Sequence, residues 1–317
     1  MKTRRRTLWV LVLLIGLTGG ALALLTRQNR AAEQAELEAA EGKIPLLAFS
    51  TNTLEQITVT ANGETNTLCV SDGSWTLAED PAYHLDATDC NTMVTALSAL
   101  NAKRRLTEQA GETYGLESPT AVVTVTVQGQ KTTLTIGAKN PLTGDYYLKK
   151  AGDDALYTVA GNKIPCLILT KAELFGAFQP AGLTASSIEA VCIRKTGQDP
   201  VELKAVSQAE NSDSSAYRMV WQRTDAPETT LDETKVNALL SALCSYVSAQ
   251  DTAADRTGLT PAAQVTVTTA DGTVELTYWE GADGWYLTVE GDDSLYTIDL
   301  SSVQTILAPA EELYAGA

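Results

Sequence analysis

The amino-acid sequence predicts an α+β protein in which an N-terminal transmembrane helix precedes two tandem repeats, each an antiparallel sheet with one principal helix. Three observations support this fold class. Residues 7–26 form an uncharged and mostly apolar run. Residues 75–97 align without gaps on residues 221–243, with eight identities in 23 positions. In each repeated stretch, an apolar pattern of helical period is followed by strands in which apolar and polar residues alternate.

The N-terminal run predicts that the chain is anchored in a membrane. Twenty helical residues span about 30 Å, which is the thickness of the bilayer core. The basic residues Lys2, Arg4, Arg5 and Arg6 precede the run. They predict that residues 1–6 form a cytoplasmic stub and that the bulk of the chain lies outside the cytoplasm. The alternative is a cleaved signal peptide, because Ala21-Leu22-Ala23 has the small-x-small pattern of a cleavage site. The apolar run continues beyond that site, which favours an uncleaved anchor.

The charge of the chain limits its partners. The 317 residues include 23 Lys and Arg against 39 Asp and Glu. Because six of the basic residues and none of the acidic ones precede residue 31, residues 31–317 carry a formal charge of −22. Such an acidic body repels phosphate backbones, so we expect no nucleic-acid partner. With a single histidine, His84, and no phosphate-binding or serine-hydrolase motif, we also expect no catalytic residue, cofactor or metal site.

The repeat and the local composition predict the domain boundaries. Residues after the span are rich in Ala, Glu and Gln and contain no Gly or Pro before Gly42, which is typical of a helix. The predicted regions are a juxtamembrane helix and linker (27–50), a first repeat (51–170), a linker (171–185) and a second repeat (186–314).

Each repeat is predicted to contain one amphipathic helix. In the first repeat the helix is expected over residues 86–102, with an apolar stripe formed by Cys90, Met93, Val94, Leu97 and Leu100. The corresponding stripe in the second repeat is formed by Val236, Leu239, Leu240, Leu243, Tyr246 and Val247. Asp86 and Asp232 occur at matching positions where an N-cap is needed, each preceded by a leucine.

Two further pairs of matching residues are predicted to be structural. Trp75 and Trp221 each precede a helix and are followed by a proline, and we expect each indole to fill the core between helix and sheet. Gly115 and Gly258 each open a Gly-Leu pair that is followed by a proline and an alternating strand. All four residues are therefore interpreted as determinants of the fold.

These motifs together resemble a known family. The N-terminal span, the strands around the tryptophan, the Leu-Asp helix start, Tyr114-Gly115-Leu116 and the closing Tyr-Tyr-Leu…Leu-Tyr hairpin are similar to those of the bacterial domain-of-unknown-function family 4340. The resemblance covers roughly residues 50–310, but Thr257 replaces the tyrosine in the second repeat. The family implies a single-span protein of the bacterial cell membrane, often linked to an ABC-type transport system, and it offers no catalytic residues.

Two recurring features are candidates for contact with a ligand. Tyr146, Tyr147, Trp285 and Tyr286 form an aromatic pair at the same place in each repeat, and one residue of each pair is expected to be exposed because neighbours on a strand point to opposite faces. The sequences Gly152-Asp153-Asp154 and Gly291-Asp292-Asp293 could hold Ca²⁺, but their position between two strands favours a turn. We therefore interpret them as turns.

The five cysteines are predicted to be free. Cys69, Cys90, Cys166, Cys192 and Cys244 have long spacings, and none has a cysteine at the matching position of the other repeat. A disulfide that stabilised this fold would be expected in both copies.

The sequence therefore predicts a non-enzymatic, membrane-anchored extracytoplasmic binding or scaffold protein. Its partners would be the bilayer, through residues 7–26, and a protein of the membrane or envelope, with an accessory role in an ABC-type transport system. The alternative is a module that binds cell-wall glycan or polysaccharide through exposed aromatic residues.

Overall fold

The computed structural model describes residues 44–107, 113–209, 217–253 and 255–315. The predicted cytoplasmic stub, the predicted span at 7–26 and most of the region 27–50 lie outside these residues. None of the helices in the described part is both long enough and apolar enough to cross a membrane.

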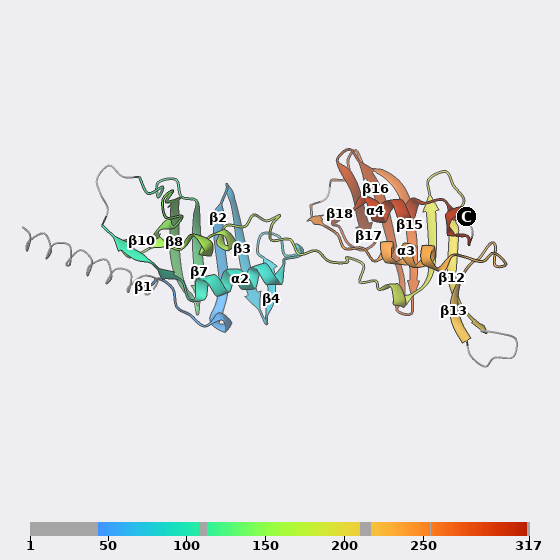
Figure 1. Cartoon of the computed structure of the whole chain (residues 1–317), viewed down its shortest axis with the longest axis horizontal. Coiled ribbons are helices and arrows are strands. Elements are labelled where there is room, and N and C mark those ends of the chain that lie inside the picture. Colours follow the sequence, from blue (N-terminus) through green and yellow to red (C-terminus); the bar gives the residue numbers. More distant parts are fainter. Residues whose placement is uncertain (1–43, 108–112, 210–216, 254, 316–317) are drawn as a thin grey trace, which may run out of the picture. The chain divides into compact units, whose positions relative to one another are not determined.

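The prediction of an α+β fold with two antiparallel sheets is confirmed (Figure 1). Each sheet has eight strands, and the two sheets share one order: β4-β3-β2-β7-β8-β9-β10-β6 and β13-β12-β11-β15-β16-β17-β18-β14. The strands of the first sheet are β2 (Leu54–Ala61), β3 (Glu64–Ser71), β4 (Ser74–Leu77), β6 (Arg104–Leu106), β7 (Ala121–Val127), β8 (Gln130–Lys139), β9 (Tyr146–Lys150) and β10 (Leu156–Val159). Those of the second are β11 (Ile188–Lys195), β12 (Val201–Ala209), β13 (Tyr217–Arg223), β14 (Ala249–Asp251), β15 (Thr260–Thr269), β16 (Gly272–Gly281), β17 (Gly284–Val289) and β18 (Leu295–Ile298).

Alternation along the strands gives each sheet one buried face. In the first sheet Ile57 pairs with Val125 and Val59 pairs with Val123, and all four side chains are buried. Thr124, which lies between those two valines, pairs with a threonine on each side, and its hydroxyl lies 2.9 Å from the hydroxyl of Thr133 on β8. Apolar residues therefore face the core and β-branched polar residues face outward.

One helix of moderate length follows the first three strands of each sheet: α2 (Ala87–Ser98) and α3 (Glu233–Leu243). The carboxylate of Asp232 accepts hydrogen bonds from the backbone N–H of Thr234 at 2.8 Å and of Lys235 at 3.3 Å, and Asp86 caps α2 in the same way. These N-caps satisfy donors that the first helical turn leaves without partners. The predicted capping role of both aspartates is confirmed.

The predicted helices were too long at their C-terminal ends. All five residues of the predicted first stripe are buried, but α2 ends at Ser98. Residues Asn101–Ala102 instead form β5, which pairs with β1 (Ile44–Pro45). In the second repeat α3 ends at Leu243, and Tyr246 is 67% exposed. From Val247 onward the backbone forms hydrogen bonds with other segments and no longer with the preceding helical turn. The Val247 N–H, for example, donates to the Phe178 carbonyl at 2.9 Å.

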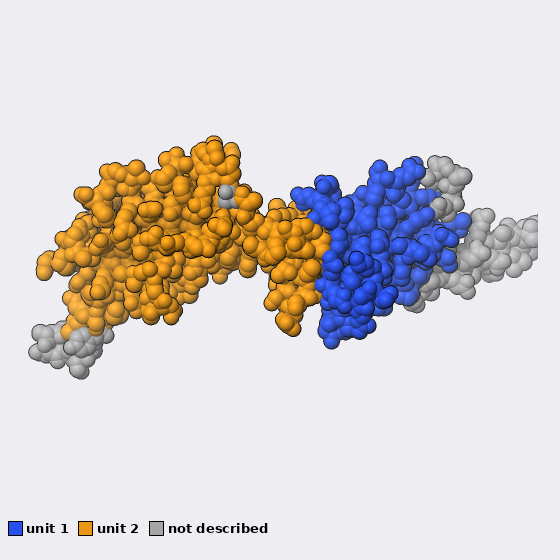
Figure 2. Space-filling view, turned by 180° about the vertical axis from the view of Figure 1, so that it is seen from behind, with its two compact units in different colours: residues 1–65, 91–169 blue, residues 66–90, 170–317 orange. Residues whose placement is uncertain are grey.

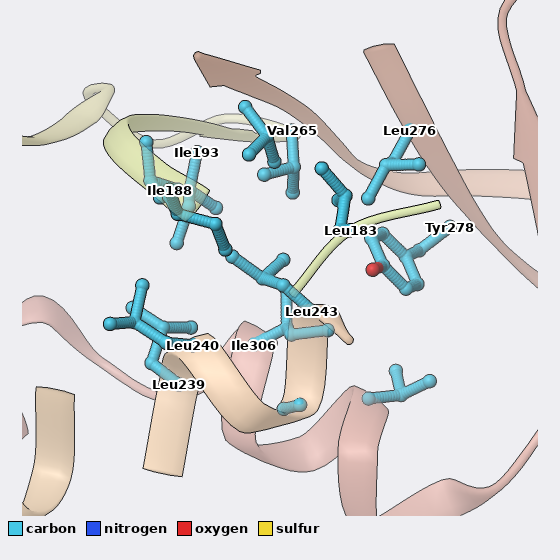
Figure 3. Packing of buried hydrophobic residues seen from close by; sticks show 14 of the residues in the cluster. Leu183, Ile188, Ile193, Leu239, Leu240, Leu243, Val265, Leu276, Tyr278 and Ile306 are labelled. Carbon is cyan, nitrogen blue, oxygen red and sulfur yellow. The ribbon is translucent and has the colours of Figure 1, made fainter. Parts of the chain in front are cut away.

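The core of the second repeat lies between the sheet and two helices (Figure 3). Figure 3 shows Leu239, Leu240 and Leu243 of α3 directed toward the side chains of Ile188 and Ile193 of β11. A second helix, α4 (Leu300–Leu307), adds Ile306 to this cluster. In the first repeat, the corresponding region contains two short 3₁₀ turns, Gly161–Lys163 and Pro165–Leu167.

The end of each repeat returns to the start of its helix. The Asp86 N–H donates to the Leu174 carbonyl, and the Asp232 N–H donates to the Leu313 carbonyl, both at 2.8 Å. Leu174 and Leu183, which lie in the predicted linker, are buried. Residues 171–185 thus contribute to packing and do not act as a simple spacer.

The chain also divides into two compact units, which are coloured in Figure 2. One contains residues 1–65 and 91–169, and the other contains residues 66–90 and 170–317. This division differs from the division into two sheets. Residues 66–90 of the second unit include β4 and most of β3, and both strands belong to the first sheet.

Candidate functional site

The aromatic pairs occupy matching positions on β9 and β17, but none of their four side chains is fully exposed. The Tyr147 hydroxyl accepts a hydrogen bond from Asn140 Nδ2 at 2.8 Å, and its ring packs edge-to-face on Tyr114 with centroids 4.9 Å apart. Trp285 packs against the core of the second repeat. Tyr146 and Tyr286 are also half-buried. The expected division into one buried and one exposed residue in each pair is therefore not seen, because all four side chains are half-buried.

The two Gly-Asp-Asp sequences are turns whose first aspartate is held by the following strand. The Asp153 carboxylate accepts from the Ala155 N–H at 2.9 Å and from the Tyr157 hydroxyl at 2.6 Å. The hydrogen bond from Tyr157 lowers the pKa of Asp153. Asp292 accepts in the same way from the Ser294 N–H and the Tyr296 hydroxyl. This arrangement uses the aspartate oxygens within the turn, as the turn interpretation requires.

The pKa values of Asp292 and Tyr296 shift in opposite directions. Burial by itself would raise the pKa of Asp292, but hydrogen bonds from Tyr296 and Ser294 bring that pKa below its usual value. Burial and the Asp292 carboxylate together raise the pKa of Tyr296 to about 12. Asp292 is therefore charged and Tyr296 neutral at physiological pH. In the described part of the chain, no group of three or more His, Cys, Asp and Glu side chains is arranged to hold a metal ion.

Gly115 and Gly258 both adopt positive φ, at 70° and 86°. At Gly115 a Cβ atom would also lie 2.6 Å from the backbone nitrogen of Ala138, because the Tyr114 carbonyl accepts a hydrogen bond from that nitrogen. At Gly258 a Cβ atom would meet nothing within 4 Å. Both positions require glycine for backbone conformation, but close approach adds a second requirement in the first repeat.

Trp75 and Trp221 are half-buried on the edge strands β4 and β13. This differs from the expectation that each indole fills the core of its repeat. In the first repeat Leu77, two residues later, is the fully buried residue of β4. Trp221 packs against the core of the second repeat but is only partly buried.

Trp221 forms part of a groove between β13 and the start of α3. The groove has a volume of about 660 Å³. Its walls include Met219 and Trp221 on the strand, Pro227 and Leu231 on the connecting loop, and Val236 and Asn237 on the helix. Arg218 and Glu233 stand at its rim and form an exposed ion pair at 3.3 Å. The rest of the lining is mostly polar, so the groove combines a few apolar side chains with many hydrogen-bonding groups. Such a mixture is typical of surfaces that bind a protein or a peptide.

The groove results from a longer hairpin in the second repeat. At a shift of 146 residues, Met219 corresponds to Gly73, which lies in the tight turn between β3 and β4. In the second repeat the strand continues through that position, and β13 has seven residues where β4 has four. This site was not predicted from the sequence, although the absence of a glycine turn before Trp221 indicates the longer hairpin.

A buried arginine supports the base of this hairpin. Arg223 corresponds to Leu77 of the first repeat and is 9% exposed. Its guanidinium donates to the Asp225 carboxylate and, at 2.6 Å, to the Tyr314 hydroxyl. The hydrogen bonds from Arg223 lower the pKa of the Asp225 carboxyl. The charge of Arg223 is therefore matched within the fold, and we assign it no role in binding.

All five cysteines are free in the described structure. Cys90 is buried in the apolar stripe of α2, and burial raises the pKa of its thiol to about 12. Such a thiol is a poor nucleophile at neutral pH.

The fold and these sites define a class of protein: a tandem pair of α+β repeats, each with a one-sided antiparallel sheet whose first three strands lead into a capped helix. The model of the family described as "Domain of unknown function (DUF4340)" matches residues 75–257, more than half of the chain. The chain belongs to this family. No match is found among the curated proteins. None is found among the solved structures either.

Proposed function

We propose that this chain is a non-enzymatic, membrane-anchored protein of the bacterial envelope that binds another protein through the groove of the second repeat. The groove carries the proposal, because it places a half-buried Trp221 and a largely exposed Met219 beside a helix start. Tryptophan and methionine are enriched where proteins bind proteins. In this proposal, residues 7–26 hold the chain in the membrane with its bulk outside the cytoplasm.

The proposed partner is a membrane subunit of an ABC-type transport system, for which the chain acts as an accessory component. The test is purification of the full chain from solubilised membranes, followed by mass spectrometry of the proteins that accompany it. Asn237→Arg places a bulky charge on the groove wall at an exposed helix position. It should remove the permease and ATPase subunits from the purified material.

The first repeat supplies a matched control for this experiment. Asn91 is the counterpart of Asn237 and is also exposed, but it belongs to α2. Asn91→Arg should leave co-purification unchanged. Equal loss with both variants, or transport subunits that persist with Asn237→Arg, would count against the groove as the binding site.

Membrane anchoring is tested separately. Protease added to intact protoplasts should digest the body of the chain and spare a short N-terminal fragment. Complete protection of residues 50–317 would contradict the proposed orientation. Release of the whole body into the medium without protease would instead favour cleavage after the apolar run.

Glycan binding is the alternative function. It would depend on Tyr146, Tyr147, Trp285 and Tyr286, whose side chains are half-buried. Binding of the full chain to isolated cell wall, lost when Tyr146 or Tyr286 is changed to alanine, would favour this alternative.

A further inference from the structure

Strand β13 forms one edge of the second sheet. Its backbone groups can be assigned from the pairing with β12. The Thr224 N–H donates to the Glu202 carbonyl at 3.0 Å, and Gln222 lies opposite Lys204. Because backbone groups alternate in direction along a strand, even-numbered residues of β13 bond to β12. The N–H and C=O groups of Met219 and Trp221 point to the free edge.

The side chains of Met219 and Trp221 lie on one face of β13, since they are two residues apart. Trp221 is opposite Ala205, and Met219 is opposite Ser207. Both odd-numbered residues border the groove, and Met219 is 65% exposed. The strand therefore presents, side by side, two outward backbone units, an exposed thioether and a half-buried indole.

We propose that β13 pairs antiparallel with β13 of a second copy of this chain, about a twofold axis through Val220. In this register Met219 of each copy lies opposite Trp221 of the other. Both residues have outward backbone groups, so each Met219–Trp221 pair exchanges two hydrogen bonds. The thioether of one copy then contacts the indole of the other at the end of the groove, which is a favourable sulfur–aromatic contact.

Side chains flanking the axis are compatible with this pairing. Val220 lies opposite Val220 of the second copy, and such β-branched pairs suit adjacent strands. Arg218 lies opposite Gln222 of the second copy, so like charges do not meet directly. The Arg218 guanidinium already has a partner in Glu233. Moving the axis by one residue either way, to Met219 or to Trp221, would lose both Met–Trp pairs.

A second copy is favoured as the occupant because the edge is complementary to itself. A twofold axis requires that each residue find its partner on the same strand, and the segment 219–221 meets that requirement in backbone direction and in side-chain character. The corresponding edge strand of the first repeat, β4, has four residues and turns at Gly73 in place of the methionine. The pairing uses Met219 and Trp221, which also border the groove proposed for the transport partner. The position of the crosslink distinguishes the two proposals, because a dimer linked through β13 supports the pairing whether or not transport subunits co-purify.

The experiment uses the full chain in detergent micelles, with the photoreactive residue p-benzoylphenylalanine in place of Met219. Illumination should give a product of twice the 33.7 kDa chain mass, with the crosslink mapped by mass spectrometry to Trp221 or its neighbours in β13. The same probe at Leu300, which is 52% exposed on α4, should give no such product. A monomer only, a crosslink to another protein only, or a dimer linked elsewhere would overturn the proposal.

A second variant tests the backbone pairing. Met219→Pro removes an outward N–H but no hydrogen bond to β12, whereas Met219→Leu retains the N–H and the apolar side chain. In sedimentation equilibrium, Met219→Pro should raise the dimer dissociation constant about tenfold or more, because the symmetry removes the bond twice. Met219→Leu should remain close to the parent. A dimer unaffected by the proline, with an unchanged circular dichroism melt, would refute pairing at this edge. If the proline unfolds the repeat, the crosslink position decides.

Discussion

Tyr278 offers a direct test of how the second core is built. Its side chain is fully buried, and its hydroxyl has no hydrogen-bond partner in the described structure. Burial raises the pKa of this phenol, so the proton stays on the oxygen at neutral pH. The first repeat has Ile136, which is also fully buried, at the corresponding position. We therefore expect that Tyr278→Phe stabilises the second repeat.

The magnitude follows from the cost of an unsatisfied polar group. A buried donor without a partner costs about 1–3 kcal/mol, and loss of the oxygen leaves a small void, so a net gain of about 1 kcal/mol is expected. For a unit of this size, that corresponds to an increase in melting temperature of about 2–4 °C. Tryptophan fluorescence is a suitable probe because three of the five tryptophans, at 221, 279 and 285, lie in the second repeat.

Tyr296→Phe is the matched control in the same core. Tyr296 is 2% exposed, but its hydroxyl donates to the Asp292 carboxylate. Removal of this charge-assisted hydrogen bond should cost about 2 kcal/mol, so the two substitutions should shift the unfolding midpoint in opposite directions. If Tyr278→Phe destabilises by as much as Tyr296→Phe, the Tyr278 hydroxyl has a partner and the reasoning fails.

Three further predictions concern the turns, pH and thiols. Gly258→Ala should lower the free energy of unfolding by about 1 kcal/mol, because an alanine is strained at positive φ. Gly115→Ala should lower it by clearly more, because the new Cβ would also meet Ala138. Equal losses for the two variants in denaturant unfolding would show that this close approach is unimportant. Hydrogen bonds from Ser301 and Ser302 hold the pKa of Asp299, the N-cap of α4, at about 2. Because the folded pKa lies below the unfolded one, this stabilisation is complete above about pH 4 and is lost as the pH falls toward 2, and Asp299→Asn should flatten that part of the acid melting curve. Thiol titration of the unreduced, unfolded chain should find all five cysteines free, and a melting temperature that falls on reduction would contradict this.

Features set by local rules could be predicted from the sequence. The stripe from Cys90 to Leu97 is buried on α2, and both Asp86 and Asp232 cap helices, because helical period and capping depend on residues close in the chain. The repeat also predicted two similar sheets, and the shared strand order follows from it.

Features set by distant partners could not be predicted in this way. β6 and β14 are short and polar, and they become strands by pairing with β10 and β18. Trp75 and Trp221 are half-buried on the edge strands β4 and β13, and residue type alone does not specify whether an indole lies at the centre or at the edge of its sheet. The groove follows from the length of one hairpin, so comparison of the two repeats carries more information about the candidate site than either copy alone.

The hydrogen bonds that join each helix start to the end of its repeat also affect the order in which the chain can fold. The ribosome synthesises the chain from the N-terminus, and the acceptor of the Asp86 N–H, the Leu174 carbonyl, is synthesised 88 residues after its donor. In the second repeat, the Leu313 carbonyl is synthesised 81 residues after the Asp232 N–H that donates to it. Each helix can form early in synthesis. The hydrogen bond from its N-cap residue to the distant carbonyl can form only after the last segment of its repeat has been synthesised. A chain that ended at Ala310 would lack the Leu313 carbonyl. The start of α3 would then lose this hydrogen bond even if the sheet of the second repeat formed normally.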